Sequence, residues 1–350
     1  MSRWRSMAAL GLFVALMMAF GFWYSYQQSQ ASPDVPIKAT ITIYTDLPNN
    51  LTSFIADKYQ VERQVRVKIM PLTGAQMARR MNPNYLDQDG DIILTSKDNL
   101  VLGAKGNHLL GMYSETIDLV PPQFKDDNGA WVGTWYDPII FTQNTQYYNH
   151  LGQFITTWST LAKPGAWTVV MTDYMAAESA ANIFYSFVET EGEEGALNYM
   201  KALEEHITQH AKYLDTPIRL ASLNEVNVGI GNYSDGQAYA KQGYPVKLIF
   251  PQDGTPYYLT GAGVLKSTQQ YEESVNFVNW LLAKQTNLDM AVNGYAFVFT
   301  NPEVADPVDS LGHGLVLFNT QGGYTVEGKK QLLDTWLKQV RFSINKKGNS

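Results

Sequence analysis

Apolar and polar residues alternate in short runs between residues 39 and 94 of the chain, and stretches with helical spacing separate these runs. The alternating runs are rich in β-branched residues, which predicts strands over Ala39 to Tyr44, Gln64 to Met70 and Gly90 to Leu94. The stretches between them predict helices over Leu51 to Lys58 and Gly74 to Met81. This order of elements is typical of a parallel sheet with helical crossovers.

The middle of the chain carries longer elements. Trp131 to Asn144 is mostly extended and Trp167 to Thr172 is apolar, so both predict strands. Thr157 to Leu161 predicts a short helical turn between them. A helix is predicted to begin at Glu178, to restart at Glu193 and to end near Gln209.

The stretch from Val226 to Leu265 says most about function. A buried strand ends at Gly231, the polar residues Asn232 to Gly236 follow, and a short helix is predicted to reach Lys241. Polar side chains that directly follow a strand lie where open α/β sheets bind ligands. Two more strands and two C-terminal helices are predicted after it, over Val246 to Phe250, Tyr257 to Leu265, Tyr271 to Lys284 and Gly328 to Phe342.

The N-terminus has the pattern of an export segment. Arg3 and Arg5 precede an uncharged run from Met7 to Tyr26, and a polar linker follows. A positive flank, an apolar run and small residues before the end of the linker predict a signal peptide cleaved after Ala31. The run is also almost long enough to span a bilayer, so an uncleaved membrane anchor is the alternative. In either case residues 1–38 precede a body at the periplasmic or extracellular side of the membrane.

Composition narrows the function classes. The chain has 350 residues, of which 45% are hydrophobic and 17% charged, enough for two lobes with cores of their own. Its net charge of −7 and the lack of a basic stripe argue against a nucleic-acid partner. It contains no cysteine, which excludes disulfides, thiolate metal sites and cysteine nucleophiles. No GxSxG, HExxH or P-loop motif is evident, so an exported enzyme is the weaker alternative.

The order of short motifs after residue 38 resembles bacterial solute-binding proteins of ABC importers, in the branch that binds ferric iron, phosphonates and sugar phosphates. The motifs are YTD, GDIILTS, GTWYDPIIFTQN, TTWSTL, VGIGNYSDG, GYPVKLIFPQDGTPYY and GAGVLKST. The resemblance implies an α/β protein with two lobes, each a mixed, mostly parallel sheet flanked by helices. Two hinge strands would join the lobes, as in the type 2 periplasmic binding proteins.

The resemblance also implies domain boundaries, a role and partners. Lobe 1 would comprise residues 39–135 and 258–305, and lobe 2 would comprise residues 136–257 and 306–350. A monomer would capture a small solute between the lobes and deliver it to an ABC permease, without a cofactor or catalytic residues. A membrane-anchored sensor of the same fold is the alternative role, with the N-terminal helix as its membrane contact.

The cleft of such a fold is lined by loops that follow strands and by helix N-termini. Thr45 and Asp46 follow the first predicted strand, and Thr95 and Ser96 follow the third, so we expect these four side chains at the ligand. The alternative for each pair is capping of the next helix by a hydroxyl or carboxylate.

A third predicted ligand loop departs from the family pattern. Phosphate and phosphonate binders commonly carry Ser-Gly-Thr at this helix start, where this chain has Ala177, Glu178 and Ser179. A carboxylate there would repel a phosphate and would suit sugar hydroxyls, an amine or a metal. We therefore rank a sugar or polyol first, then an amine, a metal and a phosphorylated compound. The alternative is that Glu178 faces solvent in the first helical turn.

The fourth predicted ligand loop contains Asn232, Tyr233 and Asp235. Asp235 can accept hydrogen bonds from a ligand, or it can cap the helix that follows. Tyr136 and Tyr258 on the two crossing strands are also expected at the cleft. Because adjacent strand residues face opposite sides, only one of Tyr257 and Tyr258 can point inward. Ferric binders place their adjacent tyrosines in a lobe-2 loop, so no iron role is assigned to this pair.

Two histidines, His206 and His210, have the i, i+4 spacing of a metal pair on a helix. The predicted helix is amphipathic and lies at the surface, so we interpret both as solvated histidines. No metal site is predicted.

Overall fold

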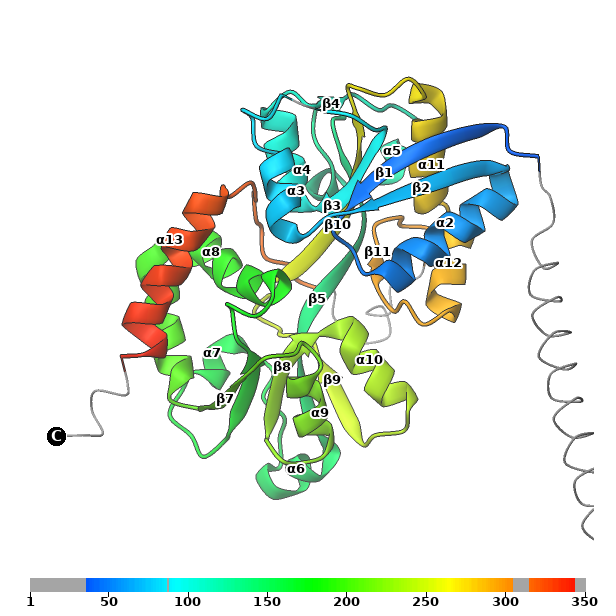
Figure 1. Ribbon diagram of the computed structural model, residues 1–350. Helices are drawn as coiled ribbons and strands as arrows, with labels where there is room; N and C mark the ends of the chain where they lie inside the picture. The colour runs from blue at the N-terminus through cyan, green and yellow to red at the C-terminus, as the bar shows by residue number, and fades with distance from the viewer. Residues whose placement is uncertain (1–35, 87, 305–314, 344–350) are drawn as a thin grey trace, which may run out of the picture.

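The computed structural model describes residues 36–86, 88–304 and 315–343, and it has two lobes (Figure 1). The predicted signal peptide or anchor lies outside these residues. Within the described ranges, no helix has the length and apolar character needed to cross a membrane.

The first lobe is built on three parallel strands. They are β1 (Ala39–Thr45), β2 (Val65–Pro71) and β3 (Ile92–Ser96), in the order β2-β1-β3. The fully buried apolar side chains Ile41 and Ile43 anchor β1 in the core. The helices of this lobe are α2 (Asn49–Arg63), α3 (Gly74–Arg80), α4 (Lys97–Lys105), α5 (Glu115–Leu119), α11 (Tyr271–Leu282) and α12 (Lys284–Val292).

The second lobe is also built on three parallel strands. Its strands β8 (Val228–Asn232), β6 (Val169–Thr172) and β7 (Ile207–Ala211) are parallel and follow one another in that order. A separate apolar core that includes Phe184 and Met171 fills this lobe. Its helices are α6 (Thr145–Leu151), α7 (Trp158–Leu161), α8 (Glu178–Glu204), α9 (Thr216–Ser222) and α10 (Tyr233–Lys241).

Two long antiparallel strands cross between the lobes. β5 (Val132–Asn144) is buried along its whole length, and β10 (Tyr257–Leu265) pairs with it and with β3. On the other side β5 pairs with β8, so the sheets of the two lobes are continuous through the crossing. The two-lobed α/β prediction is confirmed. The short strands β4 (Leu109–Leu110), β9 (Val246–Ile249) and β11 (Val298–Phe299) pair with these two strands.

The C-terminal segment lies against both lobes. α13 (Val326–Trp336) packs along α8 and also contacts α3 of the first lobe (Figure 1). A π-helical turn over Leu337–Arg341 follows it. Before α13, the backbone N–H of Gly323 donates to Asp98 in the first lobe, and Gly322 donates to Glu189 in the second. The chain therefore joins the two lobes at this segment as well as at β5 and β10.

The prediction of a helix as far as Gln209 is wrong. The predicted restart at Glu193 is confirmed, because α8 is interrupted at Gly192, which has the positive φ of 75° that glycine readily adopts. The helix then ends at Glu204. Residues Ile207–Ala211 instead form β7, which takes its hydrogen bonds from β6. The spacing of apolar residues shows only local neighbours. It therefore does not indicate the pairing with β6, whose residues are distant in sequence.

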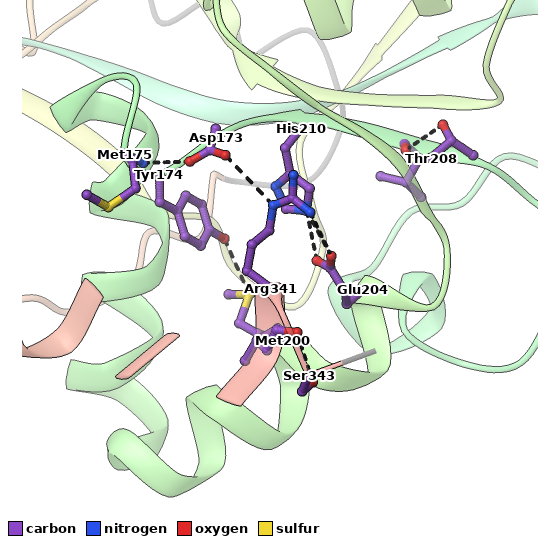
Figure 2. A network of polar contacts seen from close by, with 11 residues as sticks. Asp173, Tyr174, Met175, Met200, Glu204, Thr208, His210, Arg341 and Ser343 are labelled. Carbon is purple, nitrogen blue, oxygen red and sulfur yellow. Dashed lines mark hydrogen bonds and ion pairs between the residues drawn. The ribbon is translucent and has the colours of Figure 1, made fainter. Parts of the chain in front are cut away.

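The two histidines are consequently not solvated. His206 is 8% exposed, stacks on Trp167, and its Nε2 lies 2.8 Å from the carbonyl oxygen of Lys163. The Nε2 of His210 lies 2.8 Å from the carboxylate of Glu204, and the Arg341 guanidinium approaches the same carboxylate at 3.8 Å (Figure 2). His206 therefore ties the segment after α8 to Lys163 and Trp167, and His210 lies between Glu204 at the end of α8 and Trp336 of α13.

Candidate functional site

A cleft of about 750 Å³ lies between the lobes beside the crossing strands. The first lobe contributes the start of α2 and the segment before β11, and the second lobe contributes the starts of α8 and α10. Six of the predicted site residues line it: Asp46, Glu178, Ser179, Asn232, Asp235 and Tyr258.

On the first-lobe side, Asp46 faces the cleft directly after β1. The hydroxyl of Thr95 donates to its Oδ1 at 2.8 Å. Asp46 does not cap α2, whose N-cap is Pro48 without a side-chain hydrogen bond. Burial, together with the nearby charge of Glu178, raises the pKa of Asp46 to about 6. Its negative charge is therefore held at an energetic cost, which a cation or a hydroxyl donor in the cleft would relieve.

The other predicted residues of this side lie behind the cleft. Thr45 is fully buried, and its Oγ1 accepts from the N–H of Leu47 at 3.2 Å, which fixes the turn after β1. Thr95 is likewise buried and holds Asp46. Ser96 is the last residue of β3 and the N-cap of α4, without a side-chain capping bond.

Glu178 lines the cleft with 33% of its side chain exposed, and one oxygen of its carboxylate pairs with a lysine. It is the first residue of α8, and its Oε1 lies 2.5 Å from the Nζ of Lys329 on α13. The same Nζ lies 2.8 Å from Oδ2 of Asp98 on α4 of the first lobe. Lys329 therefore bridges two carboxylates from different lobes, at the edge of the cleft.

The start of α10 is capped by a residue from the hinge. The Asp137 carboxylate on β5 accepts from the backbone N–H of Ser234 at 3.0 Å and from its hydroxyl at 2.5 Å. Burial raises the pKa of Asp137 to about 7, although these hydrogen bonds pull it down. Asp235, in the first turn of the same helix, makes no capping hydrogen bond. Burial raises its pKa to about 6, and the neighbouring Asp215 adds to this.

The tyrosines divide as strand geometry requires. Tyr258 lines the cleft, whereas Tyr257 packs edge-on against Phe124 and Tyr136. Tyr136 itself stacks on Phe124, with ring centres 5.0 Å apart. Tyr233 packs against Phe250, and its hydroxyl accepts from Gln237 at 2.6 Å. Tyr136 and Tyr233 are thus core residues of the hinge region, outside the cleft lining.

Sequence reasoning missed several residues of the cleft. An aromatic wall comprises Trp135, Tyr295 and Phe297, in which Trp135 and Phe297 stack at 5.6 Å. Asp137 could have been found, because a carboxylate within a buried apolar strand needs a partner. Asp215, directly before α9, carries no local signal, since only the folded chain brings it to the cleft. The same holds for Lys329, which pairs with the cleft residue Glu178 without lining the cleft itself.

The raised pKa values predict how stability depends on pH. An aspartate whose folded pKa lies above its unfolded value stabilises the fold below the unfolded pKa, and this stability is lost as pH rises through the folded pKa. Between pH 5 and 7.5, we expect the unliganded protein to lose about 2 kcal/mol through Asp137 alone, which is a fall of several degrees in Tm. Calorimetric melts across this range measure it, and a Tm that rises with pH would contradict the assignment. The pKa values of Asp89 and Asp289 are lowered, so these two groups change the stability only at pH values below this window.

Comparison with known proteins gives sequence relatives of low identity. No family model matches the chain. An uncharacterised protein of Haemophilus influenzae is 27% identical over 244 residues, which are 66% of this chain and 70% of that protein. A protein of Serratia marcescens named as an Fe(3+)-binding periplasmic protein is 22% identical and covers 77% of this chain and 79% of its own length.

Solved structures show the fold more clearly. The periplasmic binding protein AfuA of Actinobacillus pleuropneumoniae, solved with fructose-6-phosphate bound, superposes with a TM-score of 0.70 at 22% identity. The match covers 87% of this chain and all of AfuA. The chain therefore has the two-lobed fold of type 2 periplasmic binding proteins, as the order of its motifs predicts.

Proposed function

We propose that this protein is an extracytoplasmic solute-binding protein that captures a small solute in the interlobe cleft and delivers it to the permease of an ABC importer. The observation that carries the proposal is a cleft of about 750 Å³, lined by polar side chains of both lobes at the ends of β1 and β8. This volume is in the range of pockets for small molecules. The named relatives are binding proteins, which supports binding without chemical conversion.

The proposed mechanism is closure of the lobes on the solute. The lobes would be residues 39–135 with 258–305, and residues 136–257 with 306–350, as the sequence predicts. β5 and β10 would act as the hinge, and contacts from both lobes would stabilise the closed state. The proposed contacts are the six predicted residues at the cleft: Asp46, Glu178, Ser179, Asn232, Asp235 and Tyr258.

Binding and closure can be measured together on the full-length protein. A solute at a hundred times its Kd should raise the stability by about 2.7 kcal/mol, which a thermal-shift assay detects. Small-angle scattering of the same sample should show a smaller radius of gyration than that of the unliganded protein. Mass spectrometry of the released solute should show it unchanged. A solute that is converted, or a protein that binds none of sugars, sugar phosphates, amines and ferric citrate, would contradict the proposal.

A further inference from the structure

The two helix N-termini at the cleft already carry carboxylates of the chain itself. The N-terminus of a helix attracts anions because its first N–H groups have no partner within the helix. At α10 this place is taken by Asp137, which accepts two hydrogen bonds from Ser234. At α8 the first residue is Glu178, whose Oε2 also lies 3.4 Å from the position that a Cβ would take on Gly74, at the start of α3. A phosphate at either helix would meet a carboxylate.

The rest of the lining is also short of positive charge. Five carboxylates line the cleft, and no lysine or arginine does. Lys329 forms an ion pair with Glu178, but the same ammonium group also pairs with Asp98. Asp46, Asp215 and Asp235 form no salt bridge within the described residues. These three belong to opposite sides of the cleft, with Asp46 on the first lobe and the other two on the second.

An aromatic wall completes the lining. Trp135, Tyr295 and Phe297 border the cleft in addition to Tyr258. Aromatic faces attract organic cations through their quadrupole, and they also cover aliphatic carbon. Within the described residues, no three His, Asp or Glu side chains lie close enough together to hold one ion. Carboxylates of both lobes together with an aromatic wall suit a molecule that carries both amino groups and a carbon chain.

Resting on the proposed function, we propose that the solute is an organic cation with amino groups, held by Asp46 of the first lobe and by Asp215 and Asp235 of the second. The aromatic wall contacts its carbon chain. Closure brings the two sets of carboxylates onto one molecule, so the solute supplies the positive charge that the lining of the cleft lacks. The charge of the solute, and not its shape alone, then stabilises the closed state.

Titration calorimetry of the full-length protein tests this proposal with putrescine, spermidine, glucose, sorbitol, fructose-6-phosphate, inorganic phosphate and ferric citrate. We expect at least one of the two amines to bind at least a hundredfold more tightly than any of the five probes that are not amines. Tightest binding of a sugar, a phosphate or ferric citrate would overturn the cation proposal and leave the solute-binding function standing. Binding of none of the probes would overturn both.

Charge-only variants locate the contacts. Asp46→Asn and Asp235→Asn keep the shape of the side chain, and each should weaken amine binding at least tenfold. Glu225→Gln removes the same charge from an exposed position of the second lobe outside the cleft, and it should leave the affinity within twofold of the unmutated protein. Equal losses in all three variants would show a general effect of net charge and overturn the assigned contacts. Unchanged affinity in both cleft variants would also overturn them.

Discussion

A Lys329→Met variant is expected to lose about 3 to 5 kcal/mol of stability, because it leaves two partly buried carboxylates without their cation. Lys329 bridges Asp98 of the first lobe and Glu178 of the second, with 16% of its side chain exposed. Burial alone would lower the pKa of this lysine, but the two carboxylates outweigh it and raise the pKa above its ordinary value. The ammonium group of Lys329 is therefore charged at neutral pH, and its removal leaves one carboxylate unpaired in each lobe.

Chemical denaturation of Lys329→Met measures this loss, with Lys330→Met as the matched control. Lys330 is the next residue of α13 and is exposed, so its replacement should change the free energy of unfolding by less than about 0.5 kcal/mol. An Asp98→Asn, Glu178→Gln, Lys329→Met triple variant should recover part of the loss, since no buried charge is then left unpaired. Equal stability of the two single lysine variants would mean that the bridge does not hold the lobes together.

An Asp137→Ala variant is expected to lose about 2 to 3 kcal/mol, from the lost cap and from the backbone N–H that it leaves unsatisfied at the start of α10. Asp137→Asn keeps an oxygen that can accept from Ser234, so it should retain most of the stability. Because asparagine does not titrate, this variant should also lose most of the fall in Tm between pH 5 and 7.5 that we assign to Asp137.

Asp235→Ala distinguishes the two aspartates of this helix start. Asp235 makes no capping hydrogen bond and its folded pKa is raised, so alanine should leave the unliganded protein as stable as before or slightly more stable. Thermal melts of the two alanine variants at pH 7 compare them directly. A loss at Asp235 as large as the loss at Asp137 would assign the cap to Asp235 instead.

The sequence pattern was sufficient for most elements, because their apolar faces are local in sequence. The predicted strand Tyr257 to Leu265 has the same bounds in β10, and the helix predicted from Gly74 ends within one residue of α3. The strand β7 was missed for the opposite reason. Its five residues are spaced like the end of a helix, and only pairing with β6 makes them a strand. Short edge strands of this kind depend on partners that local spacing does not indicate.

The candidate site shows the same division. Residues that directly follow strands, such as Asp46, Asn232 and Asp235, were predicted from position alone, since strand ends of one sheet meet at one edge. Their roles were not, because capping and ligand contact require the same residue types. Distances decide between the two roles: Asp137 caps α10, and Asp235 stays open to the cleft.

By itself, then, the sequence determined the strands, the helices and the strand ends that face the cleft, because hydrophobic periodicity and turn residues act over a few neighbouring positions. The two-lobed arrangement was implied by the resemblance in the order of the motifs. The tertiary structure alone decided which charges of the site are paired. Lys329 lies 151 residues from Glu178 in sequence, and its ammonium group is within hydrogen-bonding distance of that carboxylate only after the C-terminal helix has packed along α8. Electrostatic pairing depends on distance in space, which the fold sets.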